Sequence, residues 1–236
     1  NGKINYVTEK VVKDSTITLT INNEISRSLS AIEDSLEEFA VGYLFNENMV
    51  KSIDDIEKIE INENHINVEI DDKLLKTKET VLCSDSSGGW RSKIKEIEPI
   101  SSDFQVEADE LINRIEELKN NAQIWQATGG THVAGIVYKN NFIVKEDVSR
   151  HVAVDKVIGY GILHNYDLSN SYVIYSGRMP ADMVIKIVRA GIPVLASNAA
   201  PAYSGCETAK KGNVTLVGFL RGQRFNVYNN KNRIIF

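Results

Sequence analysis

The sequence predicts an α/β protein in which a small N-terminal α+β domain precedes a three-layer α/β domain. In the first third of the chain, apolar residues recur with a period of two around one stretch of helical spacing. From residue 124 onward, strand-like and helix-like segments alternate. A small, polar, glycine-rich stretch separates the two patterns. We therefore expect domains at residues 1–82 and 124–236, joined by a mobile cysteine loop and a linker helix at residues 83–123.

The composition is that of a globular cytoplasmic protein. The chain has 236 residues, 42% of them hydrophobic and 25% charged, with a net charge of -5. This acidic balance argues against non-specific binding of nucleic acid or of an anionic membrane, and we expect neither partner. No apolar run reaches the roughly 18 residues of a membrane span, and the N-terminus carries no signal-peptide pattern. Two cysteines do not make a disulfide framework, so a reduced, cytoplasmic protein is expected.

Antiparallel strands and one helix are expected in the N-terminal domain. Residues 3–30 are expected to be strands because apolar residues alternate with threonines between positions 17 and 21. A helix is expected at residues 33–44, where the apolar residues recur at i, i+3 and i+4. Residues 53–70 predict a second pair of strands around an Asn-Glu-Asn turn.

The connecting segment contains a loop and then a helix. Residues 82–90 read Leu-Cys-Ser-Asp-Ser-Ser-Gly-Gly-Trp, which is typical of an exposed, mobile loop. Residues 99–121 begin as a linker and become an amphipathic helix whose apolar side is Leu111, Ile115 and Leu118.

The C-terminal domain is expected to alternate strands with helices. Its predicted elements are hairpin strands at 133–138 and 142–145, a helix at 148–164, a strand at 172–175, a helix between Pro180 and Gly191, a strand at 194–196, a helix at 202–211, and strands at 214–220 and 225–228.

A glycine-containing loop is the first candidate site. In Thr128-Gly129-Gly130-Thr131, the glycines allow backbone amides to approach a phosphate and the threonine hydroxyls add donors. His132 follows as a candidate base or ligand. The alternatives are a plain tight turn and a hydrogen-bonded core histidine.

The second candidate is the helix that contains residues 147–156. His151 and Asp155 share a helical face at i, i+4, so the carboxylate is placed to orient the imidazole. Arg150 and Lys156 are candidates to meet an anion. The alternative is a solvated surface of ion pairs.

Two further loops carry arginine. Ser176-Gly177-Arg178 precedes a helix N-terminus, which is a place for anions unless it is an ordinary connection. In the run from Phe219 to Asn226, Arg221 and Arg224 have the spacing to clamp a pyrophosphate. The two phenylalanines of this run could stack on a base or a pterin. The alternative is a basic surface turn with core phenylalanines.

The two cysteines differ in their surroundings. Cys83 lies in the polar loop, where a thiol is either an exposed nucleophile or a bystander, and Arg91 or Lys93 would lower its pKa if close. Cys206 falls in an expected helix and is predicted to be a small buried residue. A zinc deaminase would need His-x-Glu and Pro-Cys-x-x-Cys, but the chain reads His132-Val133-Ala134 and has no Cys-x-x-Cys, so no metal site is expected.

Five motifs in order resemble those of the formate dehydrogenase accessory sulfurtransferases, the FdhD-like family, over nearly the whole chain. They are Thr-Gly-Gly-Thr-His-Val-Ala at 128, Glu-Asp-Val-Ser-Arg-His-Val-Ala-Val-Asp-Lys-Val-Ile-Gly at 146, Tyr-Ser-Gly-Arg-Met-Pro-Ala-Asp-Met-Val at 175, Ala-Gly-Ile-Pro-Val-Leu-Ala-Ser-Asn-Ala-Ala-Pro at 190 and Gly-Phe-Leu-Arg-Gly-Gln-Arg-Phe-Asn-Val-Tyr at 218. The stretch Leu-Glu-Glu-Phe-Ala-Val-Gly-Tyr-Leu at 36 also resembles the family.

The resemblance implies a function and a site. Such proteins take persulfide sulfur from a cysteine desulfurase and pass it to the molybdenum bis(guanine dinucleotide) cofactor of formate dehydrogenase, for which GDP is a surrogate ligand. The resemblance further implies a homodimer and a C-terminal domain similar to the cytidine deaminase fold. The expected catalytic residue is Cys83, and the expected cofactor-binding residues are Gly129, Gly130, Thr131, His132, Arg150, His151, Asp155, Ser176, Gly177, Arg178, Phe219, Leu220, Arg221, Gly222, Gln223 and Arg224.

The loop that contains Cys83 departs from the family pattern. The family usually carries Cys-x-x-Cys-Gly there, whereas this chain reads Cys83-Ser-Asp-Ser-Ser-Gly-Gly, with Ser86 or Ser87 where a cysteine is expected. Because a serine cannot carry a persulfide, two alternatives remain. Either Cys83 transfers sulfur alone, or this member is a non-catalytic chaperone that binds the cofactor or a guanine nucleotide. A degenerate deaminase-like hydrolase is a third alternative.

Overall fold

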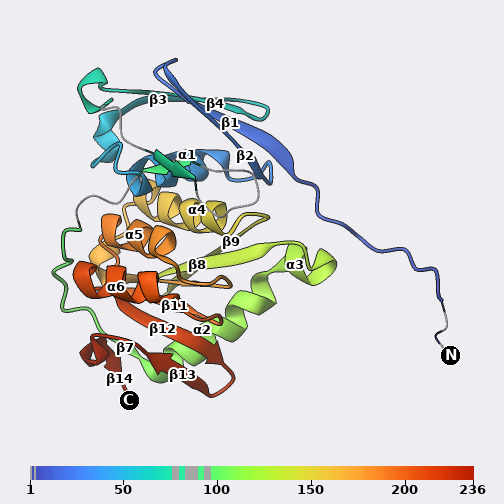
Figure 1. Ribbon diagram of the computed structural model, residues 1–236, viewed down its shortest axis with the longest axis vertical. Helices are drawn as coiled ribbons and strands as arrows, with labels where there is room; N and C mark the ends of the chain where they lie inside the picture. The colour runs from blue at the N-terminus through green and yellow to red at the C-terminus, as the bar shows by residue number, and fades with distance from the viewer. Residues whose placement is uncertain (1, 3, 76–79, 83–89, 93–96) are drawn as a thin grey trace.

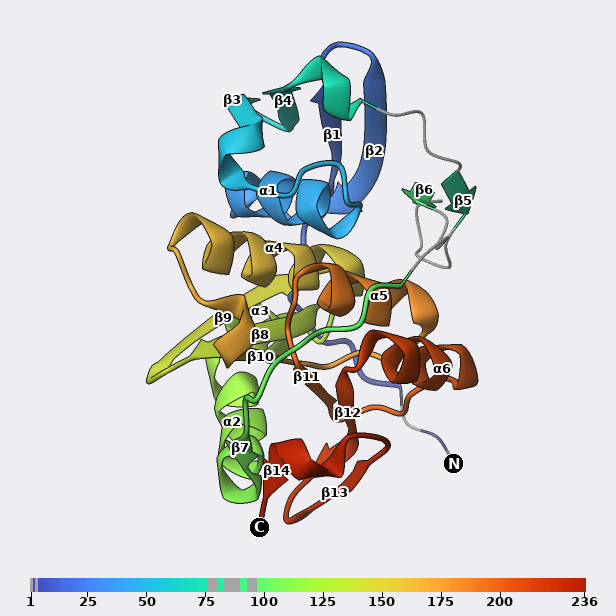
Figure 2. The same ribbon diagram turned by 90° about the vertical axis from the view of Figure 1, so that its left-hand side faces the viewer.

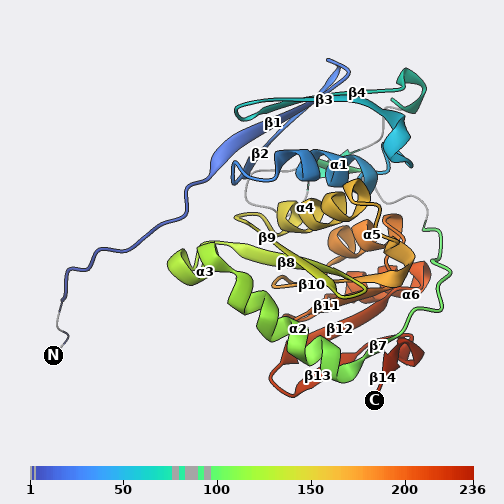
Figure 3. The same ribbon diagram turned by 180° about the vertical axis from the view of Figure 1, so that it is seen from behind.

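The computed structural model describes residues 2, 4–75, 80–82, 90–92 and 97–236, and these residues form stacked layers (Figure 1). A four-stranded sheet lies above one helix, which rests on a layer of three helices. Those three helices cover one face of a six-stranded sheet, and a further helix covers its other face (Figures 1 and 3). This arrangement confirms the predicted α/β class with a smaller N-terminal α+β part and a three-layer C-terminal part. Similarity to the cytidine deaminase fold stays a prediction.

The N-terminal sheet has the strand order β2-β1-β4-β3. Its hairpins are antiparallel, but β1 pairs with β4 in parallel, which differs from the expected all-antiparallel arrangement. The reason is that α1 crosses the sheet between β2 and β3, and a helical crossover returns the chain in its original direction. The elements are β1 (Ser15–Ile21), β2 (Ile25–Ala31), α1 (Leu36–Asn46), β3 (Ile56–Asn62) and β4 (His65–Ile70), with 3-10 turns at Ile53–Asp55 and Asp72–Leu74.

The C-terminal sheet has the order β13-β12-β11-β10-β8-β9. Strands β10, β11 and β12 are parallel, and β8 is antiparallel to both of its neighbours. The strands are β8 (His132–Tyr138), β9 (Asn141–Asp147), β10 (Ser171–Tyr175), β11 (Val194–Ser197), β12 (Thr215–Arg221) and β13 (Arg224–Val227). The helices are α2 (Ala108–Asn121), α3 (Gln123–Thr128), α4 (Arg150–Leu163), α5 (Ala181–Arg189) and α6 (Tyr203–Gly212), with 3-10 turns at Leu168–Asn170 and Lys231–Arg233.

Alternation along the strands builds a core on each face of this sheet. In β10, Val173 and Tyr175 pack with α4, α5 and α6, whereas Tyr172 and Ile174 pack with α2. The predicted apolar side of α2 (Leu111, Ile115, Leu118) is buried in this second core. Although α2 lies in the segment that we expected to be a linker, it therefore forms one layer of the C-terminal sheet. The predicted domain boundaries stay a prediction.

The two sheets are joined through the crossing of α1 and α4. A Cβ at Gly42 would lie 1.9 Å from the carbonyl oxygen of Asp155, and one at Gly159 would lie 1.8 Å from that of Glu38. The backbones of the two helices therefore touch, and no larger residue fits at either position without moving a helix. As a result α4 lies between α1 and the sheet, and most of its residues are buried.

Two buried ion pairs reinforce this junction. Asp147 binds Lys156, and its Oδ2 also accepts a hydrogen bond from the backbone of Ile32 in the N-terminal part. Asp155 binds Lys186 of α5 and accepts a hydrogen bond from Asn46 at the end of α1. Burial of a charge is costly unless the charge is paired, so these contacts hold the two parts of the chain in a fixed relation.

Two short strand pairs and an N-terminal segment complete the description. Strands β5 (Thr80–Leu82) and β6 (Trp90–Ser92) pair antiparallel, and β7 (Val106–Glu107) pairs with β14 (Ile234–Ile235). Figure 2 shows the β5–β6 pair on the side of the molecule where α5 and α6 lie. Cys83, Ser86, Ser87 and Lys93 lie outside the described residues. Residues 4–11 run away from the body of the molecule (Figure 1), and Ile4, Tyr6, Val7 and Val11 are largely exposed to solvent.

Candidate functional site

The candidate site lies at the edge of the six-stranded sheet where β10, β11 and β12 end and β8 begins. The chain also leaves β9 at this edge and enters α4, and α5 and α6 begin here. It is the side of the sheet next to α3 in Figure 3. Loops that follow parallel strands are the usual place for ligands in α/β sheets. Most of the predicted residues meet at this edge, although they come from distant parts of the chain.

The loop after β10 is held at three points. The hydroxyl of Tyr175 donates to the carbonyl of Arg178, and Ser197 Oγ donates to the carbonyl of Gly177 at 2.7 Å. The Oγ of Ser176 accepts a hydrogen bond from the backbone of Val133 at 3.0 Å. The loop is therefore rigid, while the side chain of Arg178 at its tip is exposed.

Gly177 makes room for an arginine beneath the loop. A Cβ at Gly177 would lie 2.7 Å from the ring of Tyr175 and 3.3 Å from Cδ of Arg150. Arg150 begins α4 and is half-buried, so its stem packs under the loop that ends in Arg178. The structure thus brings two of the predicted arginines to neighbouring positions.

His132 stands beside this loop at the start of β8. Its Nδ1 lies 3.4 Å from Ser176 Oγ. Burial lowers the pKa of His132, and the positive charge of Arg150 lowers it further. We therefore expect a neutral imidazole at pH 7, which is able to accept or donate a hydrogen bond at the site.

Asp182 is a site residue that the sequence did not indicate. Its Oδ2 lies 3.3 Å from Nε2 of His151, whose side chain has no exposed surface. Burial acts to raise the pKa of Asp182, but contact with the His151 imidazole and the nearby charge of Arg150 outweigh it and lower the pKa to about 2. The carboxylate at His151 is thus Asp182, which is distant in sequence, and the helical i, i+4 spacing pointed to Asp155 instead.

Asp155 belongs to the junction of the two sheets and not to the loop surface. Its side chain is completely buried and pairs with Lys186 and Asn46. Lys156 is equally buried and pairs with Asp147. Because these side chains have no exposed surface, Asp155 cannot contact a cofactor in this structure, contrary to our expectation. It stabilises the fold instead. The alternative of a solvated charged surface is also wrong for this helix.

A carboxylate of the chain itself, that of Glu146, holds the loop between α3 and β8 in place. Glu146 accepts hydrogen bonds from the backbones of Ile124 and Trp125 and from the hydroxyl of Thr131. Gly129 ends α3 with φ 65°, and the Gly130 amide donates to Thr128 Oγ1 at 3.1 Å. These groups are satisfied within the chain, which favours the tight-turn interpretation for this loop. Gly129 and Gly130 remain exposed at the rim of the site.

The turn between β12 and β13 presents the second arginine pair. Arg221 and Arg224 are opposite each other across the turn, which Gly222 enters with φ 54°. The Nε of Arg221 donates to the carbonyl of Asn198 at 2.8 Å, which ties this turn to the loop after β11. Gly222, Gln223 and Arg224 are exposed, whereas the Leu220 side chain is buried in the core.

Phe219 is held in an unusual conformation. Its φ is 53°, which is costly for a residue with a bulky side chain, and the register between β12 and β13 shifts here. Its ring is 38% exposed and lies 6.0 Å from the guanidinium of Arg221. The strained backbone therefore presents an aromatic ring beside a cation at the surface of the site.

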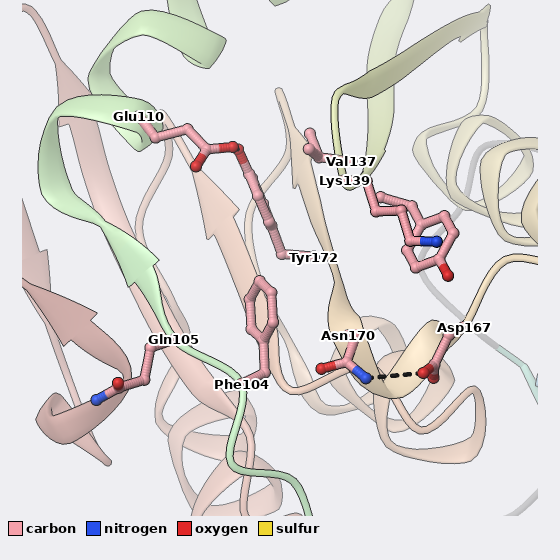
Figure 4. A pocket seen from close by; sticks show the side chains of 9 residues that line it. Phe104, Gln105, Glu110, Val137, Lys139, Asp167, Asn170 and Tyr172 are labelled. Carbon is pink, nitrogen blue, oxygen red and sulfur yellow. Dashed lines mark hydrogen bonds between the residues drawn. The ribbon is translucent and has the colours of Figure 1, made fainter.

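A separate cavity of about 430 Å³ lies at the opposite end of the strands (Figure 4). Tyr172 and Phe104 form one side of it and Lys139 lies on the other, and Tyr138 also lines the cavity. The hydroxyl of Tyr172 donates to Glu110 at 3.0 Å, and Asn170 donates to Asp167 at 2.7 Å. These four polar side chains are paired with one another, and the cavity lining contains none of the predicted site residues.

The described residues contain neither a metal-site cluster nor a helix that could span a membrane. Among these residues, no group of three or more His, Cys, Asp or Glu side chains has the arrangement of a metal site. In the same part of the chain, no helix has the length and apolar character needed to span a membrane. Cys206 lies in α6 as predicted, but it is only partly buried against the core and not fully buried as expected, and burial raises its pKa.

The fold and the site define a class of α/β protein whose main sheet ends in basic, rigid loops suited to anions. The chain belongs to the FdhD/NarQ family, whose sequence profile matches residues 12–235. It is 48% identical to a sulfur carrier protein FdhD of Methanothermobacter thermautotrophicus, over 97% of this chain and 93% of that protein. It is 34% identical to a protein FdhD of Methanocaldococcus jannaschii, over 97% and 92% of the two chains. The family resemblance predicted from the motifs is confirmed.

A solved structure shares the same fold. The crystal structure of a putative formate dehydrogenase accessory protein from Desulfotalea psychrophila superposes with a TM-score of 0.80. The two chains are 28% identical, and the match covers 96% of this chain and 91% of the other. The mixed α/β architecture is therefore that of this group of proteins.

Proposed function

We propose that the protein is a sulfur carrier in the maturation of formate dehydrogenase. It accepts persulfide sulfur from a cysteine desulfurase and passes it to the molybdenum bis(guanine dinucleotide) cofactor, which is its substrate. It acts in the cytoplasm as a homodimer. The observation that carries the proposal is the match of nearly the whole chain, at 48% identity, to a relative named as a sulfur carrier.

The chemistry of the candidate site supports a substrate with phosphates and flat rings. Arg178, Arg221 and Arg224 are exposed in loops at one sheet edge, and Arg150 lies beneath the first of these loops. Guanidinium groups bind phosphate oxygens through two parallel hydrogen bonds. The exposed ring of Phe219 is available to stack on a base or a pterin. The residues present therefore fit a guanine nucleotide.

Cys83 carries the sulfur in this proposal. Its thiolate attacks the terminal sulfur of the desulfurase persulfide, so one S–S bond breaks, one forms, and the desulfurase thiolate leaves. This exchange between the two cysteines needs no added oxidant or reductant because the sulfane sulfur moves at an unchanged oxidation level. The serines of this loop cannot substitute for Cys83, since an alcohol does not form a persulfide.

Mass spectrometry tests this step directly. After incubation with a cysteine desulfurase and cysteine, the protein is expected to gain about 32 Da, one sulfur atom, on the peptide that contains Cys83. Cys83→Ala is expected to lose the adduct and to fail in formate dehydrogenase maturation. Cys206→Ala is the matched control and is expected to keep both. Absence of the adduct in the wild-type protein contradicts the proposal.

A non-catalytic chaperone is the second candidate, because the loop lacks the second cysteine of the family pattern. A chaperone would bind the cofactor or a guanine nucleotide and would need no thiol. Titration with GDP followed by maturation assays separates the two. GDP binding together with full activity of Cys83→Ala favours the chaperone, and absence of GDP binding counts against both candidates.

A further inference from the structure

The segment between β11 and α6, residues 198–202, joins the two arginine-bearing loops of the site. On one side, the carbonyl of Ala199 accepts a hydrogen bond from the backbone of Phe219 at 3.0 Å, just before the turn between β12 and β13. On the other side, the amide of Ala202 donates at 3.1 Å to the carbonyl of Met179, which ends the loop after β10. Backbone contacts therefore fix this segment between the two pairs of arginines.

Tyr203 follows this segment as the first residue of α6. Its two neighbours in sequence both contact the region after β10, because Ala202 binds Met179 and the Oγ of Ser204 accepts from the amide of Ala181 at 3.4 Å. In an α-helix the Cα–Cβ bond is tilted toward the N-terminus. The side chain of Tyr203 therefore projects toward the end of α6 that lies at the candidate site.

The ring of Tyr203 is available to a ligand. It is 82% exposed, compared with 38% for the ring of Phe219. Because so little of the ring is buried, the fold gains little stability from it. A tyrosine ring nevertheless offers a large, flat, rigid contact surface at a low cost in conformational entropy.

We propose that Tyr203 is a further ligand-contact residue, whose ring stacks on the base of the bound nucleotide. The arginines of the two loops hold the phosphates, and the aromatic ring between these loops holds the base. The two parts of the nucleotide are thus bound by different side chains. Tyr203 in this way favours a nucleotide over a free diphosphate, which offers no flat ring.

Titration with GDP and with inorganic pyrophosphate tests this inference, which rests on the proposed nucleotide site. Tyr203→Ala is expected to bind GDP about tenfold more weakly, through loss of stacking, and to bind pyrophosphate as the wild type does. Tyr203→Phe keeps the flat ring and is expected to bind both ligands as the wild type does. Tyr6→Ala removes another exposed tyrosine, far from α6 in sequence, and is the control that is expected to keep full GDP affinity.

Three outcomes overturn the inference and leave the nucleotide site standing. They are unchanged GDP affinity in Tyr203→Ala, an equal loss of GDP and pyrophosphate affinity, which would place the effect on the arginine loops, and a loss in Tyr203→Phe as large as that in Tyr203→Ala. A wild type that does not bind GDP refutes the nucleotide site and this inference with it. Thermal unfolding of Tyr203→Ala is expected at the wild-type temperature, so weaker binding would not come from a loss of folded protein.

Discussion

At the scale of single residues, Phe219 combines strain with exposure. A positive φ in a phenylalanine costs about 1 kcal/mol or more, and the cost is retained only where something depends on the ring position. Substitution of Phe219 by glycine removes both the strain and the ring. This substitution therefore distinguishes an effect of the ring on stability from an effect on ligand binding.

For Phe219→Gly we expect the free energy of unfolding to change by less than about 0.5 kcal/mol, because relief of strain offsets lost contact. GDP affinity is expected to fall about tenfold through loss of stacking. Urea unfolding and GDP titration measure the two effects. A loss of stability with unchanged affinity would show that the ring supports the fold and not the ligand.

Asp182 also predicts a pH dependence. Its pKa falls from 3.8 in the unfolded chain to about 2 in the fold, so its contribution to stability is present above pH 3.8 and is lost as the pH falls toward 2. The contribution is about 2 kcal/mol. We expect Asp182→Asn to show a smaller loss of stability between pH 4 and 2 than the wild type in urea titrations. Parallel curves for the two proteins would contradict this.

At the scale of elements, α6 approaches the site through a glycine. A Cβ at Gly205 would lie 1.9 Å from the carbonyl of Met179, which directly follows the Arg178 loop. The same carbonyl accepts a hydrogen bond from the backbone of Ala202. The position of α6 and the geometry of the loop after β10 are therefore coupled.

Gly205→Ala is expected to destabilise the protein by about 2 kcal/mol, since a helix must shift to admit the methyl group. It is also expected to weaken GDP binding, because the shift displaces the loop that carries Arg178. Thermal unfolding and GDP titration measure the two effects. Gly191→Ala is a comparison for strain alone, since a Cβ there meets no atom within 4 Å but φ is 72°. If both variants bind GDP like the wild type, the coupling is refuted.

At the scale of the whole molecule, the junction of the two sheets predicts cooperative unfolding. Lys186→Met leaves Asp155 buried without its cation and is expected to cost about 3 to 5 kcal/mol. Because the pair lies between α1, α4 and α5, we expect one transition, seen at the same midpoint by far-UV circular dichroism and tryptophan fluorescence. Separate midpoints would show that the N-terminal part unfolds alone.

The sequence predicted most regular elements because their periodicity is local. The apolar side of α2 and the strands of the β8–β9 hairpin are confirmed for this reason. The parallel pairing of β1 with β4 was not predicted, because it depends on a crossover between distant segments and not on a local sequence pattern. The helix α3 was not predicted because six residues are too few to show helical periodicity. The helix predicted at residues 148–164 is confirmed as α4, and it is buried on the α1 side as well as on the sheet side.

The candidate site was predictable where residues are neighbours in sequence and not where they meet only in space. The loops at Ser176 and Phe219 were found from glycine, arginine and aromatic residues, and their role as ligand contacts stays a prediction. Asp182 was missed because its partner His151 lies on another helix. Asp155 was wrongly assigned to the cofactor site because the i, i+4 spacing from His151 does not show whether a side chain is buried or exposed.

The contact between Gly42 and Gly159 restricts how sequences of this family can vary. Each glycine faces a backbone carbonyl on the other helix. A clash with a neighbouring side chain can be relieved by a second substitution that makes that side chain smaller, but a clash with a backbone carbonyl cannot. Compensating substitutions are therefore excluded at these two positions. We expect relatives that keep this crossing to have glycine at both, even where the surrounding side chains have diverged, and a relative with a larger residue at either to have its N-terminal sheet displaced.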